Sequence, residues 1–167
     1  ARSIFDLHKG EIEKSLKGLK SVMNDKKWGI PSKHCMIEIY LNPKRKYIWE
    51  VQEPLTTKEN IQKAQELIDQ IYKQSDEDDE QISIEKELIL AELEKSTNTN
   101  ASISSATTRY QTILNHLQNP TKASEINSSS LSSSSGIAAL VGLSACLLRL
   151  DQQKEAVNLI DQLIKPS

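Results

Sequence analysis

An uncharged apolar run, SSSGIAALVGLSACLLRL at residues 133–150, constrains the fold of this sequence more than any other feature. No charged residue occurs among the thirteen from Gly136 to Leu148. As a helix they would extend roughly 20 Å, whereas a helix that crosses the hydrocarbon of a bilayer needs about 20 apolar residues. The run is also rich in Gly, Ala and Ser, which let a second helix approach closely. We therefore expect a helix buried between other helices, with no direct insertion into a membrane.

A second, amphipathic helix follows this run after a short polar break, so the unit is a helical hairpin. In the second helix a small residue is followed by larger apolar residues four and seven positions later, which places all three on one helical face. The same pattern occurs three more times. The predicted packing positions are Ser15, Leu19 and Val22; Ala64, Ile68 and Ile71; Ala106, Tyr110 and Ile113; Ala156, Ile160 and Leu163; and, in the first helix of the last hairpin, Leu140, Leu143, Ser144 and Leu147.

Four hairpins account for the chain as a single array over residues 1–167. The pattern recurs after 49, 42 and 50 residues, whereas a tetratricopeptide repeat takes about 34, so the excess must form insertions. We expect an all-α, tetratricopeptide-type solenoid with a right-handed superhelix. The expected hairpins are about 1–23, 31–73, 81–117 and 137–164, and the insertions are 43–56, 74–80, 96–101 and 118–135.

Several local signals set the expected ends of these helices. Gly10 and Asp151 occupy corresponding inter-helix turns, and Thr56 with Glu59 has the spacing of a capping box. Lys26–Lys27–Trp28 is interpreted as a helix C-terminus with favourable charges. Because Asn98 falls in an expected loop, its replacement by Asp should cost under about 0.5 kcal/mol.

Composition narrows the classes of function. The net charge of −2 offers no basic surface for many phosphates, so we expect no nucleic-acid partner. Cys35 and Cys146 lack metal-type spacing and are interpreted as buried, reduced thiols. Because the sequence opens inside a helix-like stretch without an initiator Met, we expect a fragment of a longer protein.

One stretch carries a specific resemblance. GEIEKSLKGLKSVMNDKKWG, running into CMIEIYLNP, is similar to the middle-to-late repeats of the large tetratricopeptide subunit of intraflagellar transport complex A. This is the family of intraflagellar transport protein 139, or tetratricopeptide repeat protein 21. The resemblance is close over residues 28–43 and loose elsewhere. The residues that carry it are Gly10, Asp25, Trp28, Gly29, Met36, Ile37, Glu38, Ile39, Leu41, Asn42 and Pro43.

The resemblance implies a non-catalytic scaffold that works by shape in ciliary or flagellar trains and at the ciliary base, on the cytoplasmic side. Its implied roles are retrograde transport and cargo entry. Its implied partners are other complex A subunits and, within trains, complex B or dynein. The alternative is a tetratricopeptide adaptor of another cytosolic complex, such as a chaperone-docking module. That function would need a basic clamp, whereas the first helices are mainly apolar and acidic, as in EKELILAELE.

Catalytic and metal chemistry find little support. Asp76, Asp78, Glu80 and Glu87 have calcium-loop spacing, but Gln81 stands where the sharp turn needs Gly. The histidines, His8, His34 and His116, share no metal spacing, and the serines lack a nucleophile-elbow context. We therefore expect no enzyme activity, no metal and no cofactor.

The insertion after Pro43 is both cationic and aromatic. It contains Lys44, Arg45, Lys46, Tyr47 and Trp49. These residues could contact an acidic surface of a partner. Alternatively, the insertion folds back on the array and Trp49 covers a hydrophobic edge, which is the interpretation we favour.

Overall fold

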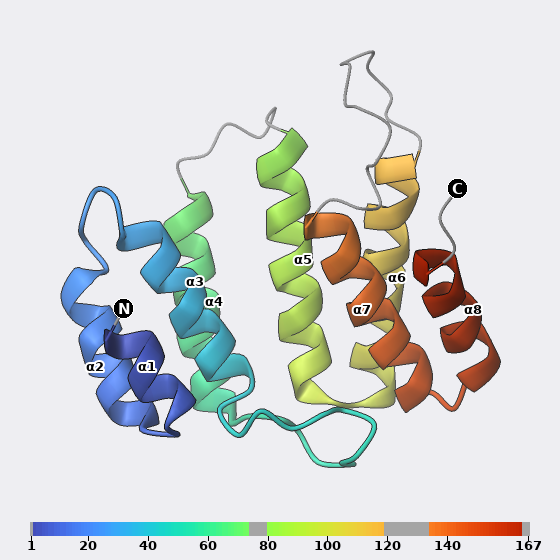
Figure 1. The fold of residues 1–167 in the computed structure, drawn as a ribbon, viewed down its shortest axis with the longest axis horizontal. Helices are drawn as coiled ribbons and strands as arrows, with labels where there is room; N and C mark the ends of the chain where they lie inside the picture. The colour runs from blue at the N-terminus through green and yellow to red at the C-terminus, as the bar shows by residue number, and fades with distance from the viewer. Residues whose placement is uncertain (1, 74–79, 119–133, 165–167) are drawn as a thin grey trace. The chain divides into compact units, whose positions relative to one another are not determined.

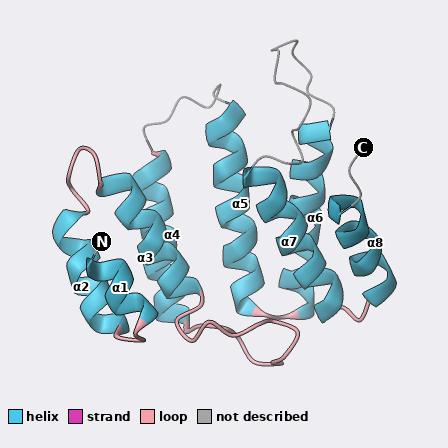
Figure 2. Cartoon of the chain, viewed as in Figure 1, coloured by secondary structure: helices cyan, strands magenta, loops and turns pink. Residues whose placement is uncertain are grey.

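The computed structural model describes residues 2–73, 80–118 and 134–164 (Figure 1). Within these ranges the chain forms helices joined by turns and loops, with no β-strand (Figure 2). The expectation of an all-α protein is therefore confirmed. The helices are α1 (Arg2–His8), α2 (Ile12–Val22), α3 (Gly29–Leu41), α4 (Lys58–Tyr72), α5 (Glu80–Thr97), α6 (Asn100–Gln118), α7 (Ser134–Arg149) and α8 (Gln153–Ile164).

The chain divides into two compact units rather than one. Unit 1 comprises Ala1–Arg45 and Leu55–Ser75, and unit 2 comprises Lys46–Pro54 and Asp76–Ser167. Most of the loop between α3 and α4 therefore belongs to unit 2, although both of these helices belong to unit 1. The expected insertions at 74–80 and 118–135 fall almost entirely outside the described residues.

In unit 1, each helix packs against the next along the chain. The contact between α1 and α2 is close because its residues are small. A side chain at Gly18 would collide with Ser3, and the buried Ser15 hydroxyl donates a hydrogen bond to the Ser3 carbonyl at 2.7 Å. The remaining core consists of Leu19, Met36, Ile37, Ile39, Tyr40, Leu41, Leu55, Ala64, Leu67 and Ile68.

In unit 2, α6 packs against both α5 and α7, α5 also contacts α7, and α8 packs against α7. Tyr110 of α6 lies at the centre and is fully buried. A side chain at Gly142 would collide with the Tyr110 ring, so the small residues of the uncharged run let α7 approach α6. The rest of this core consists of Ile48, Ile84, Ala91, Ile103, Ala106, Ile113, Leu114, Ala139, Leu140, Leu143, Ala145, Cys146, Leu147 and Ala156.

Three inter-helix turns share one backbone device, a single residue in the left-handed region. These residues are Gly10, Asn98 and Asp151, with φ of 79°, 51° and 63°. After Gly10 and after Asp151 the next backbone N–H reaches five residues back, from Glu11 to Asp6 at 2.9 Å and from Gln152 to Leu147 at 2.8 Å. This is the hydrogen bond of a Schellman motif, which satisfies carbonyls at a helix end. The correspondence between Gly10 and Asp151 therefore extends to their backbone conformation.

Some predicted helix ends need correction. The expected insertion at 96–101 is a two-residue turn, because α5 continues to Thr97 and α6 begins at Asn100. The Thr99 hydroxyl accepts from the Ser102 N–H at 3.1 Å, and the Ser102 hydroxyl accepts from the Thr99 N–H at 3.0 Å, which caps α6 reciprocally. In front of α4 the cap is Thr57, whose hydroxyl accepts from the Asn60 N–H at 3.2 Å.

Thr56, which we predicted to be the cap of α4, has another role. Its hydroxyl donates a hydrogen bond to the Tyr40 carbonyl near the end of α3. It therefore ties the start of α4 to its partner helix within unit 1.

The predicted packing positions divide into two registers. Ser15 is the fourth residue of α2, and Ala156 is the fourth residue of α8. Their N–H groups donate hydrogen bonds to the carbonyls of Glu11 and Gln152, the residues just before the two helices. In α4 and α6 the fourth residue of the helix is Ile61 or Ile103. The N–H groups of these isoleucines donate to the carbonyls of Thr57 and Thr99. Ala64 and Ala106 lie three residues later, so the shared sequence pattern begins at two different distances from the start of the helix.

Most of the predicted packing residues are nonetheless buried. Val22, at 38% exposed, and Ile160, at 41%, are exceptions. Val22 is the last residue of α2, and Ile160 lies on α8, which packs only against α7 among the described helices. Ile71 is half-buried, and Leu163 lies where the side chains of α8 are not described. The buried members are Ser15, Leu19, Ala64, Ile68, Ala106, Tyr110, Ile113, Leu140, Leu143, Ser144, Leu147 and Ala156.

Candidate interaction surfaces

The buried side chain of Asn98 binds the loop of residues 46–54 within unit 2. Its amide nitrogen donates to the Val51 carbonyl at 2.9 Å and to the Glu53 carbonyl at 2.8 Å. Its amide oxygen accepts from Nε of Arg149 at 2.9 Å, and Nη2 of Arg149 donates to the Gln52 side chain at 2.9 Å. We call these five residues the Asn98 clasp. The clasp joins the loop to the α5–α6 turn and to the end of α7.

The clasp contradicts the premise of the expectation for Asn98, which placed this residue in an open loop. The residue is only 3% exposed, and all of its amide hydrogen-bonding groups have protein partners. An Asp at this position would lose both N–H donors and would bring a negative charge to two carbonyl oxygens. Sequence reasoning missed this role because it depends on carbonyls 45 and 47 residues away.

The clasped loop presents two aromatic rings to solvent. Tyr47 and Trp49 are 56% and 44% exposed, and their rings stack with centroids 4.8 Å apart and planes 15° apart. The residue between them, Ile48, is the one that the loop buries. The insertion thus folds onto unit 2 through Ile48, and the interpretation in which Trp49 covers a hydrophobic edge stays a prediction.

The predicted cations of this insertion precede the rings along the chain. Lys44 and Arg45 are exposed and belong to unit 1, whereas Lys46 is half-buried and belongs to unit 2. Arg45 has a φ of 50°, and its N–H donates to the Asn42 carbonyl at 3.1 Å, which makes the turn out of α3. Contact with a partner through Lys44, Arg45, Lys46, Tyr47 and Trp49 stays a prediction.

A second exposed tryptophan, Trp28, stands at the turn between α2 and α3 in unit 1. It is 57% exposed, and the nearby Ile30 is 59% exposed. The intervening Gly29 is buried, and a side chain there would collide with the Met23 carbonyl. α2 ends at Val22, so Lys27 belongs to the turn and not to a helix C-terminus as predicted. Sequence reasoning therefore missed this surface.

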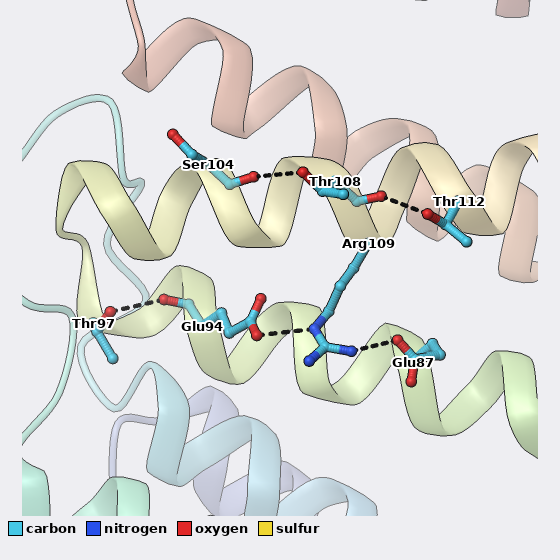
Figure 3. A network of polar contacts seen from close by, with 7 residues as sticks. All are labelled: Glu87, Glu94, Thr97, Ser104, Thr108, Arg109 and Thr112. Atoms are coloured by element: carbon cyan, nitrogen blue, oxygen red, sulfur yellow. Dashed lines mark hydrogen bonds and ion pairs between the residues drawn. The ribbon is translucent and has the colours of Figure 1, made fainter.

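A partly exposed polar network joins α5 to α6 in unit 2 (Figure 3). Arg109 of α6 reaches Glu94 at 2.9 Å and Glu87 at 2.5 Å, both on α5. The hydroxyl of Tyr110 donates to Glu92 at 2.6 Å, and burial raises the pKa of Tyr110 well above its ordinary value. The phenol therefore stays protonated and acts as a fixed donor.

Unit 2 also contains a shallow groove. Its volume is about 470 Å³, and α6, α7 and α8 line it. Leu114, Leu143 and Leu159 contribute its apolar lining, whereas Gln111 and Glu155 are among its polar residues. Among the described residues that line the groove, Glu155 is the one ionisable side chain.

The acidic residues with calcium-loop spacing do not form a metal site among the described residues. Glu87, the last position of the calcium-like spacing, pairs with Arg109, while Asp76 and Asp78 lie outside the described residues. In the described part of the chain, no three His, Cys, Asp or Glu residues gather as a metal site would require.

Burial raises the pKa of Cys146 to about 11, so its thiol is protonated at neutral pH. None of the helices in the described ranges combines the length and apolar character that crossing a membrane requires.

No protein-family model matches the chain, and no curated protein is significantly similar to it.

Proposed function

We propose that this chain is a non-catalytic scaffold for protein–protein interaction, built from tetratricopeptide-type helical hairpins. The observation that carries this proposal is the packing of two helical hairpins, α5–α6 and α7–α8. Each helix contacts the next along the chain, and the first helices of the hairpins, α5 and α7, also contact each other. Such packing is what a stacked array of hairpins requires. Rigid turns with exposed aromatic residues then supply surfaces that a partner can bind.

We further propose that the scaffold is part of a large subunit of intraflagellar transport complex A and acts in retrograde ciliary transport and cargo entry. The support is the resemblance over residues 28–43. Several of its residues have definite structural roles: Gly29 permits the close turn, and Met36, Ile37, Ile39 and Leu41 are buried. A family that keeps this hairpin would need these residue types. The proposed partners are other complex A subunits and, in trains, complex B or dynein.

Replacing Ala106 with Asp tests both levels of the proposal. Ala106 is fully buried in unit 2, so the substitution buries an unpaired charge and should cost about 3 kcal/mol or more. The matched control is Ala101→Asp, which makes the same change at an exposed position in the first turn of α6, where a negative charge is favourable.

The readout is the protein in a ciliated cell that expresses it at full length. The Ala106→Asp protein should no longer co-purify with complex A subunits, and cargo should accumulate at the ciliary tip. The Ala101→Asp protein should behave as the parent. If Ala106→Asp unfolds unit 2 while return traffic is unaffected, the assignment to complex A is wrong. If it melts like the parent and still assembles, the scaffold does not depend on hairpin packing.

A further inference from the structure

A concentration of positive charge surrounds the turn between α2 and α3. Residues 17–37 contain five lysines and one acidic residue, Asp25, in a chain whose net charge is −2. Lys26 and Lys27 are exposed on the turn itself, and Lys17 and Lys20 are exposed on α2. This segment of unit 1 therefore differs in charge from the chain as a whole.

The single acid in this segment is engaged by its own turn. One oxygen of Asp25 accepts hydrogen bonds from the N–H groups of Lys27 at 2.8 Å and Trp28 at 2.9 Å. The N–H of Gly29 donates to the Asp25 carbonyl at 2.9 Å, and the N–H of Ser32 donates to the Trp28 carbonyl at 2.9 Å. The backbone that carries Trp28 is therefore fixed on both sides.

The side chains on this fixed backbone combine an apolar surface with cations. Trp28 and Ile30 are each more than half exposed. The ammonium group of Lys27 lies 5.4 Å from the centroid of the Trp28 ring, within the range of a cation–π interaction. Exposed tryptophan on a preorganised backbone is typical of the residues that dominate binding energy at interfaces. We call Lys26, Lys27, Trp28 and Ile30 the tryptophan corner.

We propose that the tryptophan corner binds an acidic segment of a partner protein whose apolar side chains cover Trp28 and Ile30. The two lysines attract the acidic side chains of the partner segment. Trp28 and Ile30 contact the apolar side chains that lie between those acidic residues in the partner. Nucleic acid fits less well, because an extended polyanion would meet a chain of negative net charge and would leave Ile30 without an apolar partner. A membrane surface fits less well, because interfacial binding needs an apolar face that runs along a helix. This inference rests on the proposed scaffold function and adds the chemistry of one partner.

Trp28 itself can report the binding. The chain has two tryptophans, so Trp49→Phe leaves Trp28 as the sole source of tryptophan fluorescence. The probe is a twelve-residue synthetic peptide that alternates Glu or Asp with Leu. The comparison probes are the same peptide with Gln and Asn in place of the acids, polyglutamate, a single-stranded DNA oligomer, and vesicles of phosphatidylserine and phosphatidylcholine. We expect a blue shift of the Trp28 emission with the acidic peptide, and little change with the other probes.

Charge reversal then tests the lysines. The double variant Lys26→Glu, Lys27→Glu should weaken binding of the acidic peptide about tenfold, because two attractive contacts become repulsive. The control Lys58→Glu, Lys154→Glu makes the same charge change on two other exposed lysines, one at the opposite end of the α3–α4 hairpin and one on α8, and should leave binding within about twofold.

The outcomes separate this inference from the scaffold proposal. An equal response to the uncharged peptide, to polyglutamate, to DNA or to vesicles would overturn it, as would charge reversal without effect or no binding of the acidic peptide at all. The Ala106→Asp assembly experiment is independent of these lysines. If the corner fails and Ala106→Asp still abolishes assembly, the scaffold proposal stands and only the corner is lost.

Discussion

Trp28 in unit 1 and Trp49 in unit 2 are both well exposed, at 57% and 44%, yet different kinds of contact hold their backbones. The Trp28 turn depends on Asp25, only three residues away. The loop of Trp49 depends on Asn98 and Arg149, which reach it from the α5–α6 turn and from the end of α7. One surface is thus built by its own segment, and the other by the packing of a whole unit.

The difference determines how each surface should respond when the protein is disturbed. A turn closed by neighbouring residues can persist while distant helices separate. A loop fixed by a buried amide is lost as soon as the helices that position that amide come apart, since local opening follows cooperative units. We therefore expect the Tyr47–Trp49 surface to report on the integrity of unit 2, and the tryptophan corner to report on the α2–α3 hairpin alone.

The largest effect should come from breaking the clasp with Asn98→Asp. The substitution removes two buried N–H donors and brings a carboxylate to the Val51 and Glu53 carbonyls. Pairing of the carboxylate with Arg149 offsets only part of this cost, so we expect a loss of about 1–3 kcal/mol in the free energy of unfolding. Denaturant unfolding measures it. Asn100→Asp, the same change at an exposed position in the first turn of α6, should be neutral or slightly stabilising.

Thiol labelling locates that effect in one unit. Cys146 is buried in unit 2 and Cys35 is half-buried in unit 1, and burial raises the pKa of both thiols. Asn98→Asp should speed the alkylation of Cys146 and leave the rate at Cys35 unchanged. Equal acceleration at both cysteines would show that the two units open together, and the proposed contrast between the surfaces would then be wrong.

A smaller effect should distinguish the two rings themselves. Trp49→Ser removes a stacked aromatic pair and should cost about 0.5–1.5 kcal/mol. Trp28→Ser removes a largely exposed ring with one lysine over it and should cost no more than about 0.5 kcal/mol. Both are measured by denaturant unfolding. A larger loss at Trp28 than at Trp49 would mean that the tryptophan corner has a structural role that its exposure does not suggest.

The sequence predicted the helices well because their signals are local. The uncharged run and the amphipathic helix after it indicated α7 and α8, and the matching turns at Gly10 and Asp151 followed from their positions between helices. The register of the packing residues was less accessible. Ala64 and Ala106 resemble Ser15 and Ala156 in spacing, but α4 is capped by Thr57 in place of the expected Thr56, and no cap was predicted at Thr99 in front of α6.

The candidate surfaces were predictable to different degrees for the same reason. The cationic, aromatic insertion was visible in the sequence, but the choice of Ile48 as its buried residue depends on packing within unit 2. Asn98 carried no local signal, because its partners are carbonyls of a distant loop. Trp28 was missed although its turn is local, since the lysines beside it were assigned to the end of α2, which in fact stops at Val22.

The smallest effect should come from protonating Asp25. Two backbone N–H groups, those of Trp28 and Lys27, stabilise its charged form and lower its pKa below the ordinary value of 3.8. Its stabilising contribution is therefore complete above about pH 4 and is lost as the pH falls through the lowered pKa. In Asp25→Asn the amide oxygen can still accept these bonds but does not titrate. The parent should accordingly lose slightly more stability than the variant between pH 5 and pH 2 in denaturant unfolding.

Acid titration of variants with a single tryptophan, followed by fluorescence, compares the tryptophan corner with the Tyr47–Trp49 surface. In the Trp49→Phe background, acid should shift the emission of Trp28 before global unfolding, because its turn loses the Asp25 anion. In the Trp28→Phe background, Trp49 should show no shift until unit 2 unfolds, since the clasp consists of an amide, a guanidinium group, a glutamine and backbone carbonyls, none of which titrates in acid. Two results together would contradict this comparison: the same pH dependence of the unfolding free energy for the parent and Asp25→Asn, and a shift of the Trp49 emission before unit 2 unfolds. They would mean that the Trp28 turn does not depend on Asp25 and that the Trp49 loop does not depend on the clasp alone.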